Sequence, residues 1–229
     1  MSEDEKSASI AILGGTGKEG RGLALRFASH GRHVILGSRE AEKGRRIAAE
    51  LNEQLGSRGV DSAIAGASNE EAADRGNVIV STVPYDGHLD TMKPLVRLVE
   101  GKMVVTATIR WPPGLDGNAS AAEELDQALG GTARVVAAFQ TVSAKALARL
   151  SPDPDHIEDV LVFADDPAAR REAVTLVAAT GLRGVEAGPL QGARVAEALT
   201  GVLLRVNKLY GVRSTGIRIT GLPDGGSEA

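Results

Sequence analysis

The chain has 229 residues, of which 42% are hydrophobic and only 3% aromatic, so we expect a core of alanine, valine, leucine and isoleucine. Its formal net charge is −4 and no block of like charges occurs, which argues against a nucleic-acid partner. The absence of cysteine excludes disulfides, thiolate metal sites and a cysteine nucleophile, and it fits a reducing compartment.

Both ends of the chain are polar. Residues 1–8 belong to an acidic stretch that lacks the apolar core of a signal peptide, and residues 221–229 are rich in glycine, so we expect both ends to be flexible. No apolar run approaches the ~20 residues needed to span a bilayer. These features predict a cytoplasmic protein without a membrane partner.

The first half of the chain alternates short apolar runs with amphipathic segments. Apolar runs that stop at glycine or proline predict strands, and apolar residues at helical spacing predict helices. The expected strands are 9–13, 33–37, 62–66, 77–83 and 102–108. The expected helices are 17–30, 39–55, 69–76 (capped by Ser68 or Asn69) and 87–100, interrupted near Pro94.

The second half keeps this alternation after a loop at 109–120 that is rich in proline and glycine. Strands are expected at 134–140, 159–165 and within 181–188, and helices at 121–129, 167–180 and 192–211. The second of these helices begins with Pro167, a residue suited to the first helical position.

Strands and helices in alternation are typical of parallel strands joined by helical crossovers. We therefore predict an α/β fold with a Rossmann-type, doubly wound and mainly parallel sheet. It would form a single domain over 9–220, with a dinucleotide-binding core at 9–108 and a substrate-side extension at 109–220. This extension would add strands and a long docking helix, although a separate small substrate subdomain is an alternative.

A glycine-rich turn lies between the first expected strand and helix. In this context the pattern G-x-G-x-x-G predicts a dinucleotide site. Gly15 permits the tight turn, Gly17 lets the backbone approach a pyrophosphate, and Gly20 lets the helix pack against the strand. Free N–H groups at the helix start would bind the anion, unless the turn has no ligand. The candidate residues are Gly15, Thr16, Gly17, Lys18, Glu19 and Gly20.

The second expected strand ends in Gly37, Ser38 and Arg39 rather than in an acid. In NAD-specific units a carboxylate about 20 residues after the glycine turn binds the ribose 2′-hydroxyl, and it would repel a 2′-phosphate. A serine hydroxyl and an arginine fork instead attract phosphate, and Lys43 lies one helical turn after Arg39. The stretch therefore predicts NADP rather than NAD, although Ser38 alone could be a helix cap and Lys43 alone a solvated side chain.

Several stretches resemble the NADPH-dependent reductases of coenzyme F420, also called F420H2:NADP oxidoreductases. The resemblance covers residues 9–220 and is carried by the glycine turn with the "GLALR" after it, by "GSREAEK", by "IVSTVPYDGHLDTM" and by "AGPLQGARVAEALT". It implies an NADP(H) cofactor, F420 as co-substrate, and a homodimer. It also implies direct hydride transfer between two stacked rings, for which no catalytic acid or base is obligatory.

The resemblance also implies positions within the site. The 2′-phosphate would lie against Ser38, Arg39 and Lys43, near Thr16. The nicotinamide would approach the end of the fourth expected strand, at Thr82, Val83, Pro84 and Tyr85. The deazaflavin would lie beside Gln140 and Val142, although this chain has Gln-Thr-Val-Ser at 140–143 where the family commonly has a His-Thr-Ile-Pro-like segment.

Further residues are candidates for the acceptor side of the cleft. Arg110 and Trp111 follow the fifth expected strand, where α/β folds place ligands, so Trp111 could stack on a flat ring and Arg110 could hold an acidic tail. Trp111 could equally pack on the prolines of its own loop. His88 could donate a proton in the cleft, but a surface position at a helix start is the favoured interpretation. The four histidines show no metal-ligand spacing.

The residues alone leave the acceptor open. An NADPH-dependent flavin, ketone or imine reductase of a biosynthetic pathway is one alternative, and a non-catalytic NADP-sensing protein is another. The Val/Leu stripe of 191–209 is expected to form core or a dimer interface. A small-molecule co-substrate and a second copy of the chain are thus the expected partners.

Overall fold

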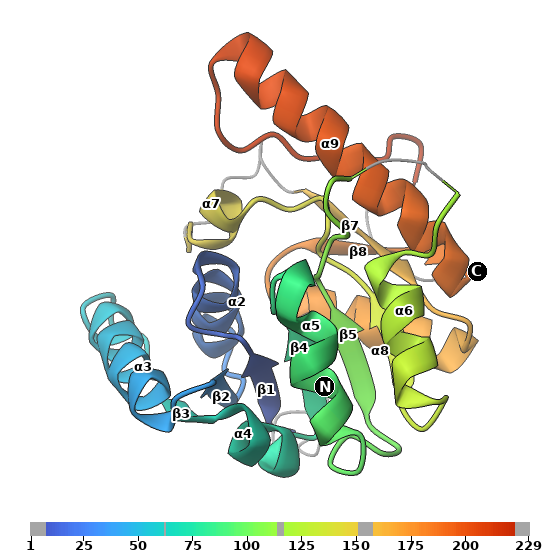
Figure 1. The fold of residues 1–229 in the computed structure, drawn as a ribbon. Helices are drawn as coiled ribbons and strands as arrows, with labels where there is room; N and C mark the ends of the chain where they lie inside the picture. Colours follow the sequence, from blue (N-terminus) through green and yellow to red (C-terminus); the bar gives the residue numbers. More distant parts are fainter. Residues whose placement is uncertain (1–7, 62, 114–116, 151–157, 223–229) are drawn as a thin grey trace.

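The computed structural model describes residues 8–61, 63–113, 117–150 and 158–222 (Figure 1). One eight-stranded sheet runs through this part of the chain, in the order β3-β2-β1-β4-β5-β6-β7-β8. Most of the two ends expected to be flexible lies outside the described residues. The strands are β1 (Ile10–Leu13), β2 (Val34–Ser38), β3 (Ile64–Ser68), β4 (Val78–Ser81), β5 (Met103–Thr106), β6 (Arg134–Ala137), β7 (Asp159–Phe163) and β8 (Arg183–Gly188).

Neighbouring strands are parallel throughout the sheet except for β6 and β7, which pair antiparallel at Ala137 and Phe163. The predicted Rossmann-type, mainly parallel sheet is therefore confirmed. The strand order reverses at β1, which pairs with β2 on one side and β4 on the other. In open α/β sheets such a reversal leaves a ligand crevice at the carboxyl ends of the strands.

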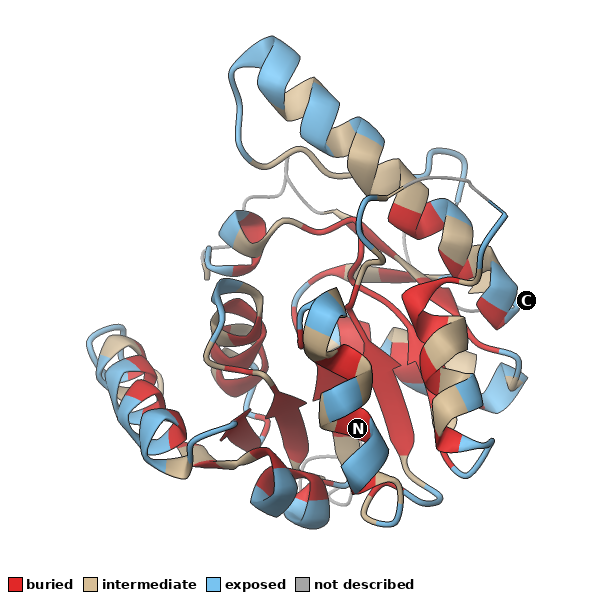
Figure 2. Cartoon of the chain, in the orientation of Figure 1, coloured by how far each residue is buried: buried red, intermediate tan, exposed pale blue. Residues whose placement is uncertain are grey.

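Helices cover both faces of the sheet, and each face has its own apolar cluster (Figure 2). Phe27, Ile47 and Leu176 belong to the cluster under α2, α3 and α8, while Met92 and Leu125 belong to the one under α5 and α6. The helices are α2 (Lys18–Ser29), α3 (Ala41–Gly56), α4 (Asn69–Arg75), α5 (Tyr85–Met92), α6 (Ala121–Leu129), α7 (Ala144–Leu147), α8 (Pro167–Ala178) and α9 (Ala193–Tyr210).

The expected elements are present, with differences at ends that bear on the site. The fourth strand stops at Ser81 rather than at 83, and the sixth stops at Ala137 rather than at 140, so the residues after them are loops above the sheet. Helix α5 begins at Tyr85, two residues before the expected start. Ser68 rather than Asn69 caps α4, through a capping box with Glu71. The short helix α7 was not predicted.

In helix α9 the buried residues are Ala193, Ala196 and Glu197, all in its first turns. Val195, Val202 and Leu209 lie seven residues apart and are 57%, 54% and 74% exposed, so these residues are not core, and the other alternative, a dimer interface, stays a prediction. The distal half of the helix extends beyond the sheet (Figure 1). No helix in the described part of the chain is both long and apolar enough to cross a membrane.

Candidate active site

The glycine turn is held tightly beneath the crevice. Gly15 N donates a hydrogen bond to the Gly37 carbonyl (2.9 Å), which ties the turn to the end of β2. A Cβ at Gly20 would lie 2.4 Å from the Gly15 Cα, so helix α2 packs against the turn only because both residues are glycine. At Gly17 a Cβ would meet only the Gly14 carbonyl oxygen, at 3.7 Å. Gly17 therefore borders open space, as a pyrophosphate-binding glycine must.

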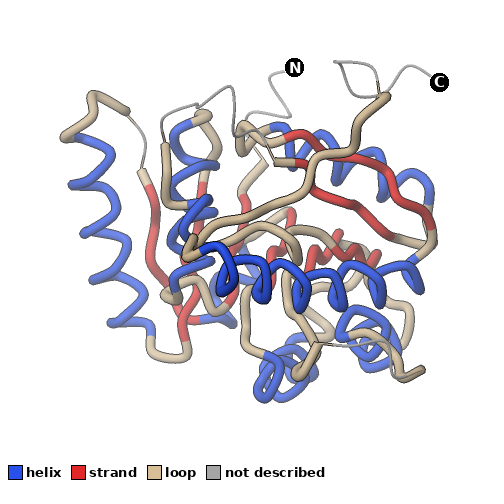
Figure 3. Tube along the Cα trace, turned by 90° about the horizontal axis from the view of Figure 1, so that it is seen from above, coloured by secondary structure: helices blue, strands red, loops and turns tan. Residues whose placement is uncertain are grey.

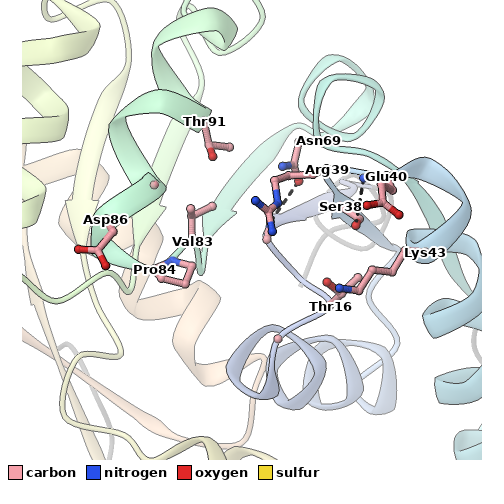
Figure 4. Close-up of a pocket in the computed structure, with 13 residues that line it drawn as sticks. Thr16, Ser38, Arg39, Glu40, Lys43, Asn69, Val83, Pro84, Asp86 and Thr91 are labelled. Atoms are coloured by element: carbon pink, nitrogen blue, oxygen red, sulfur yellow. Dashed lines mark hydrogen bonds between the residues drawn. The ribbon is translucent and has the colours of Figure 1, made fainter.

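A cavity of about 460 Å³ opens above this turn, at the carboxyl ends of β1, β2 and β4 (Figure 4). It brings together seven of the predicted cofactor residues: Thr16, Gly17, Ser38, Arg39, Lys43, Val83 and Pro84. The glycine turn, the end of β2 and the start of α5 thus surround one space. This is the place that a dinucleotide occupies in a doubly wound sheet.

The predicted phosphate-binding residues lie together on one side of the cavity (Figure 4). Ser38 is the last residue of β2, and its Oγ accepts a hydrogen bond from Glu40 N (3.4 Å). The residue at the N-cap position of α3 is Glu40, so the alternative that Ser38 caps this helix is wrong. Arg39 and Lys43 are exposed and have no ion-pair partner among the described residues. Two cations and a hydroxyl are therefore available to an anion.

The other candidate cofactor residues have different positions. Gly15 and Gly20 are buried under the turn, and Lys18 is exposed outside the cavity lining. Glu19 is half-buried in the first turn of α2, and desolvation raises the pKa of its carboxyl to about 8. Thr82 donates through Oγ1 to the Leu13 carbonyl (3.1 Å), so its hydroxyl supports the strand ends.

Two residues that the sequence did not mark as part of the cofactor site help to shape the cavity. Gly14 has φ +68°, and a Cβ there would lie 2.9 Å from Val83 Cγ2, so only glycine lets β1 turn beside β4. Asn69 Oδ1 accepts a hydrogen bond from Gly14 N (3.1 Å) and locks this turn to the start of α4. The doubled glycine of "LGGTG" was a usable signal for Gly14, whereas nothing local marks Asn69. Asp86, Gly87 and Thr91 of α5 also line the cavity.

A polar cluster lies behind the start of α5, between that helix and α6. His88 is 1% exposed, so the favoured prediction of a surface histidine is wrong. Because α5 begins at Tyr85, His88 lies within the helix and stacks on the Tyr85 ring (centroids 5.5 Å apart). Burial lowers the pKa of His88, with the Glu124 carboxylate opposing this from 3.8 Å, so the ring is neutral at pH 7. Tyr85 donates its hydroxyl to Glu124 Oε1 (3.1 Å).

The segment after β6 is strained and buried. Phe139 has φ 74°, a region that bulky residues rarely adopt and that is concentrated at functional sites. Gln140 donates through Nε2 to the Thr106 carbonyl (3.0 Å), and its own carbonyl accepts from Thr200 Oγ1 (2.8 Å). The Gln140 side-chain oxygen is buried and accepts no hydrogen bond from the described residues. Val142 packs in the core cluster under α2 and does not line the cavity above the glycine turn.

The loop that carries Arg110 and Trp111 is fastened from α9. The Glu197 carboxylate is 3% exposed and accepts hydrogen bonds from Arg110 N (3.0 Å) and Ala121 N (2.9 Å). Trp111 is 64% exposed, so it is not packed away inside its own loop. The first turn of α9 therefore holds the loop by its backbone and leaves the indole accessible. Among the described residues, no group of three metal-ligating side chains occurs.

We expect Glu197 to make the stability of the protein depend on pH. Burial raises its pKa to about 7, helped by Glu124 and Glu123 and opposed by the two backbone N–H groups. Since the folded pKa lies above the ordinary value of 4.5, the stabilisation is complete below pH 4.5 and is lost as pH rises through about 7. Glu197→Gln should reduce this fall in the free energy of unfolding by on the order of 2 kcal/mol.

Urea denaturation of both proteins between pH 4.5 and 8 measures this effect. Glu172→Gln, a partly exposed carboxylate paired with Arg134, is the matched control and should keep the wild-type slope. Parallel pH profiles for wild type and Glu197→Gln would contradict the prediction.

Comparison with known proteins agrees with this geometry. Residues 9–110 match the family described as NADP oxidoreductase, coenzyme F420-dependent. The F420-dependent NADP reductase of Methanothermobacter thermautotrophicus is 39% identical, over 94% of this chain and 96% of the relative. The enzyme of the same name from Methanocaldococcus jannaschii is 36% identical, over 93% and 98%.

The fold is also found in solved structures. A candidate F420-dependent NADP-reductase from an Arthrobacter species superposes with a TM-score of 0.77 at 24% identity, covering 92% of this chain and 98% of that chain. An imine reductase from Bacillus cereus superposes with a TM-score of 0.57 at 16% identity, over 89% and 62%. These likenesses establish the fold alone, while the near full-length sequence matches establish more: the chain belongs to the F420-dependent NADP reductase family of oxidoreductases.

Proposed function

We propose that this chain transfers a hydride between NADP(H) and coenzyme F420. The observation that carries the proposal is the cavity at the strand-order reversal, in which Ser38, Arg39 and Lys43 replace the acid of an NAD site. The relatives named F420-dependent NADP reductase match this chain over nearly their whole length. The lining holds two cations, Arg39 and Lys43, and two carboxylates, Glu40 and Asp86. The cations are on the side of Ser38, where the 2′-phosphate would bind (Figure 4).

Different residues of the cavity would bind different parts of the dinucleotide. The N-terminal turn of α2, with Thr16 and Gly17, would hold the pyrophosphate through backbone N–H groups and the helix dipole. Ser38, Arg39 and Lys43 would hold the 2′-phosphate. Val83 and Pro84 form the wall where the nicotinamide would end, and the Val83 carbonyl is fixed by Thr108 Oγ1 (2.9 Å).

The chemistry that bound NADPH supplies is a hydride, so the protein needs no nucleophile. What this chain contributes is position and exclusion of water. Gly14 brings β1 against Val83, and Gln140 ties the loop after β6 to the end of β5. We propose that the acceptor ring lies beside Gln140, Val142 and the exposed Trp111, opposite Val83. Arg110 and His88 then support this wall, His88 as a neutral ring stacked on Tyr85.

Stopped-flow mixing tests the function directly. The protein with bound NADPH is mixed with oxidised F420 and, separately, with FMN, and the absorbance of each acceptor is followed. We expect rapid reduction of F420 and slow or no reduction of FMN. Reduction of FMN alone would favour a flavin reductase, and reduction of neither would favour a ketone or imine reductase or an NADP sensor.

We also propose that residues 9–220 act as one unit and that the chain is a cytoplasmic homodimer that pairs through α9. The support for pairing is the exposed stripe of Val195, Val202 and Leu209, which no described residue covers. The absence of cysteine supports a reducing compartment.

If the chain pairs through α9, Val202→Glu should prevent the formation of the dimer. A charge at the centre of a buried apolar stripe is costly, so we expect the variant to be monomeric at micromolar concentration while its thermal stability per chain stays similar. Light scattering after gel filtration measures the mass. Arg205→Glu, on the same helix but outside the stripe, is the control. A wild-type monomer, or a Val202→Glu dimer, would contradict this interface.

A further inference from the structure

A second pocket, of about 690 Å³, lies between α7 and the segment that follows α9. Cationic side chains dominate it. The charged residues among its described lining are Lys145, Arg149, Arg213 and Arg218, with Glu158 as the one carboxylate. We call this second pocket, with its four cationic side chains, the basic pocket. So many cations in one place are unexpected on a chain whose net charge is −4, and their concentration indicates an anionic ligand.

The wall of the basic pocket is built by defined contacts. After α9 the chain turns back at Gly211 and runs alongside the helix toward β7 (Figure 3). Thr215 N donates to Asn207 Oδ1 (3.1 Å), and the Ile217 carbonyl accepts from Asp159 N (2.8 Å). Arg149 Nη2 donates to Ser214 Oγ (2.9 Å) and joins the two sides of the pocket.

The basic pocket is also in contact with helix α2, which follows the glycine turn of the proposed nucleotide site. Arg26 of α2 donates to the carbonyls of Leu147 and Ala146 in α7, at 2.9 Å each. Gly22 of α2 lies against Leu147, where a Cβ would come within 2.7 Å of the leucine Cβ. Helix α2 therefore follows the glycine turn at its start and supports the basic pocket one and two turns later, through Gly22 and Arg26.

The distance from the acceptor wall to the basic pocket is short. Lys145 in the pocket lining comes three positions after Val142, which lies beside the proposed acceptor ring. Three residues span at most about 10 Å, and less where the chain is helical. A flexible tail on the acceptor ring can reach this far.

We infer that the basic pocket binds the anionic tail of the deazaflavin acceptor, that is, the phosphodiester and glutamate carboxylates that follow its ring and ribityl chain. The inference rests on the proposed function and names a subsite of it. Lys145 and Arg213 have no ion-pair partner among the described residues, so both are available to the tail. Contacts of exposed cations with anions are individually weak and salt-sensitive, and several of them acting together set affinity for a multiply charged tail.

Steady-state kinetics with two acceptors test the subsite. One acceptor is coenzyme F420, and the other is its tail-less form, with the same ring and ribityl chain but no phosphate or glutamate. Lys145→Glu with Arg213→Glu should raise the KM for F420 about tenfold or more. The same double variant should change the KM for the tail-less form, the Kd for NADPH and the Tm very little. Arg58→Glu with Arg97→Glu is the matched control, because both arginines are exposed and line neither pocket.

The outcomes separate the subsite from the function. An unchanged KM for F420, or an equal rise for both acceptors, would overturn the subsite while leaving the hydride transfer intact. A wild-type chain that reduces neither acceptor would overturn both. If the double variant does not fold, the wild-type chain decides the question: added salt should raise the KM for F420 more than the KM for the tail-less form, and equal salt dependence would overturn the subsite.

Discussion

Replacing Arg39 by alanine is expected to raise the Kd for NADPH about 10- to 100-fold and to change the Kd for NADH less than about threefold. Hydrogen bonds to charged groups contribute about 1.5–3 kcal/mol, which corresponds to this range of affinity. Arg39 lines the cavity beside Ser38 and has no ion-pair partner among the described residues, so its removal leaves no stranded protein charge. Fluorescence titration of each nucleotide measures the two constants.

The matched control for this experiment lies nearby. Arg45 is exposed on α3 and pairs with Glu42 at 3.2 Å, but it does not line the cavity. Arg45→Ala should therefore keep the preference for NADPH. Equal Kd values for NADPH and NADH in the unmodified protein would contradict this prediction. So would an equal rise of both Kd values in Arg39→Ala, because Arg39 would then not bind the 2′-phosphate.

Gly17→Ala is expected to weaken NADPH binding, whereas Gly20→Ala is expected to reduce the stability of the protein. Gly17 has φ −73°, which alanine tolerates, and its Cβ would border the cavity, so Gly17→Ala should keep the Tm of the free protein. The same methyl group would occupy the approach of the pyrophosphate, and we expect the Kd for NADPH to rise about tenfold or more. Gly20→Ala would place its Cβ 2.4 Å from the Gly15 Cα, and we expect it to lower the free energy of unfolding by about 1–3 kcal/mol.

Thermal and urea denaturation without nucleotide, together with NADPH titration, measure both variants. Gly56→Ala is the control, since a Cβ at the end of α3 meets nothing within 4 Å. A large loss of stability in Gly17→Ala would mean that this glycine serves the fold rather than the nucleotide.

Most of the fold could be predicted because its signals are local. Apolar runs ending at glycine indicated β1 and β2. The candidate caps Ser68 and Asn69 indicated the start of α4, and Pro167 at the first helical position indicated the start of α8. The missed helix α7 is four residues long, so it carries no periodic signal; tertiary contacts with Arg26 hold it. The ends of β4 and β6 were placed late because apolar residues continue into the loops, where they pack in the core.

The site was predictable to different degrees on its two sides. The nucleotide side depends on backbone geometry and charge that one strand-turn-helix unit sets, so Gly17, Ser38 and Arg39 could be read from their spacing. Asn69 and Glu197 act across sequence separations of 55 and 87 residues, on Gly14 and Arg110 respectively, and such contacts leave no local pattern. His88 was misplaced because a shift of two residues in the start of α5 turned its side chain inward.

The antiparallel step between β6 and β7 has a consequence for how the molecule opens. The two strands share one register position, Ala137 with Phe163, whereas β7 and β8 pair along their whole length. Cooperative units of local unfolding tend to coincide with supersecondary motifs, so we expect β7, α8 and β8 to exchange their amide hydrogens as one such unit. Ile217, which lines the basic pocket, is hydrogen-bonded to the first residue of β7. The turn at Gly15 is instead hydrogen-bonded to β2. Opening between β6 and β7 would therefore move the wall of the basic pocket that Ile217 forms, while the wall of the dinucleotide cavity at Gly15 and β2 stays in place.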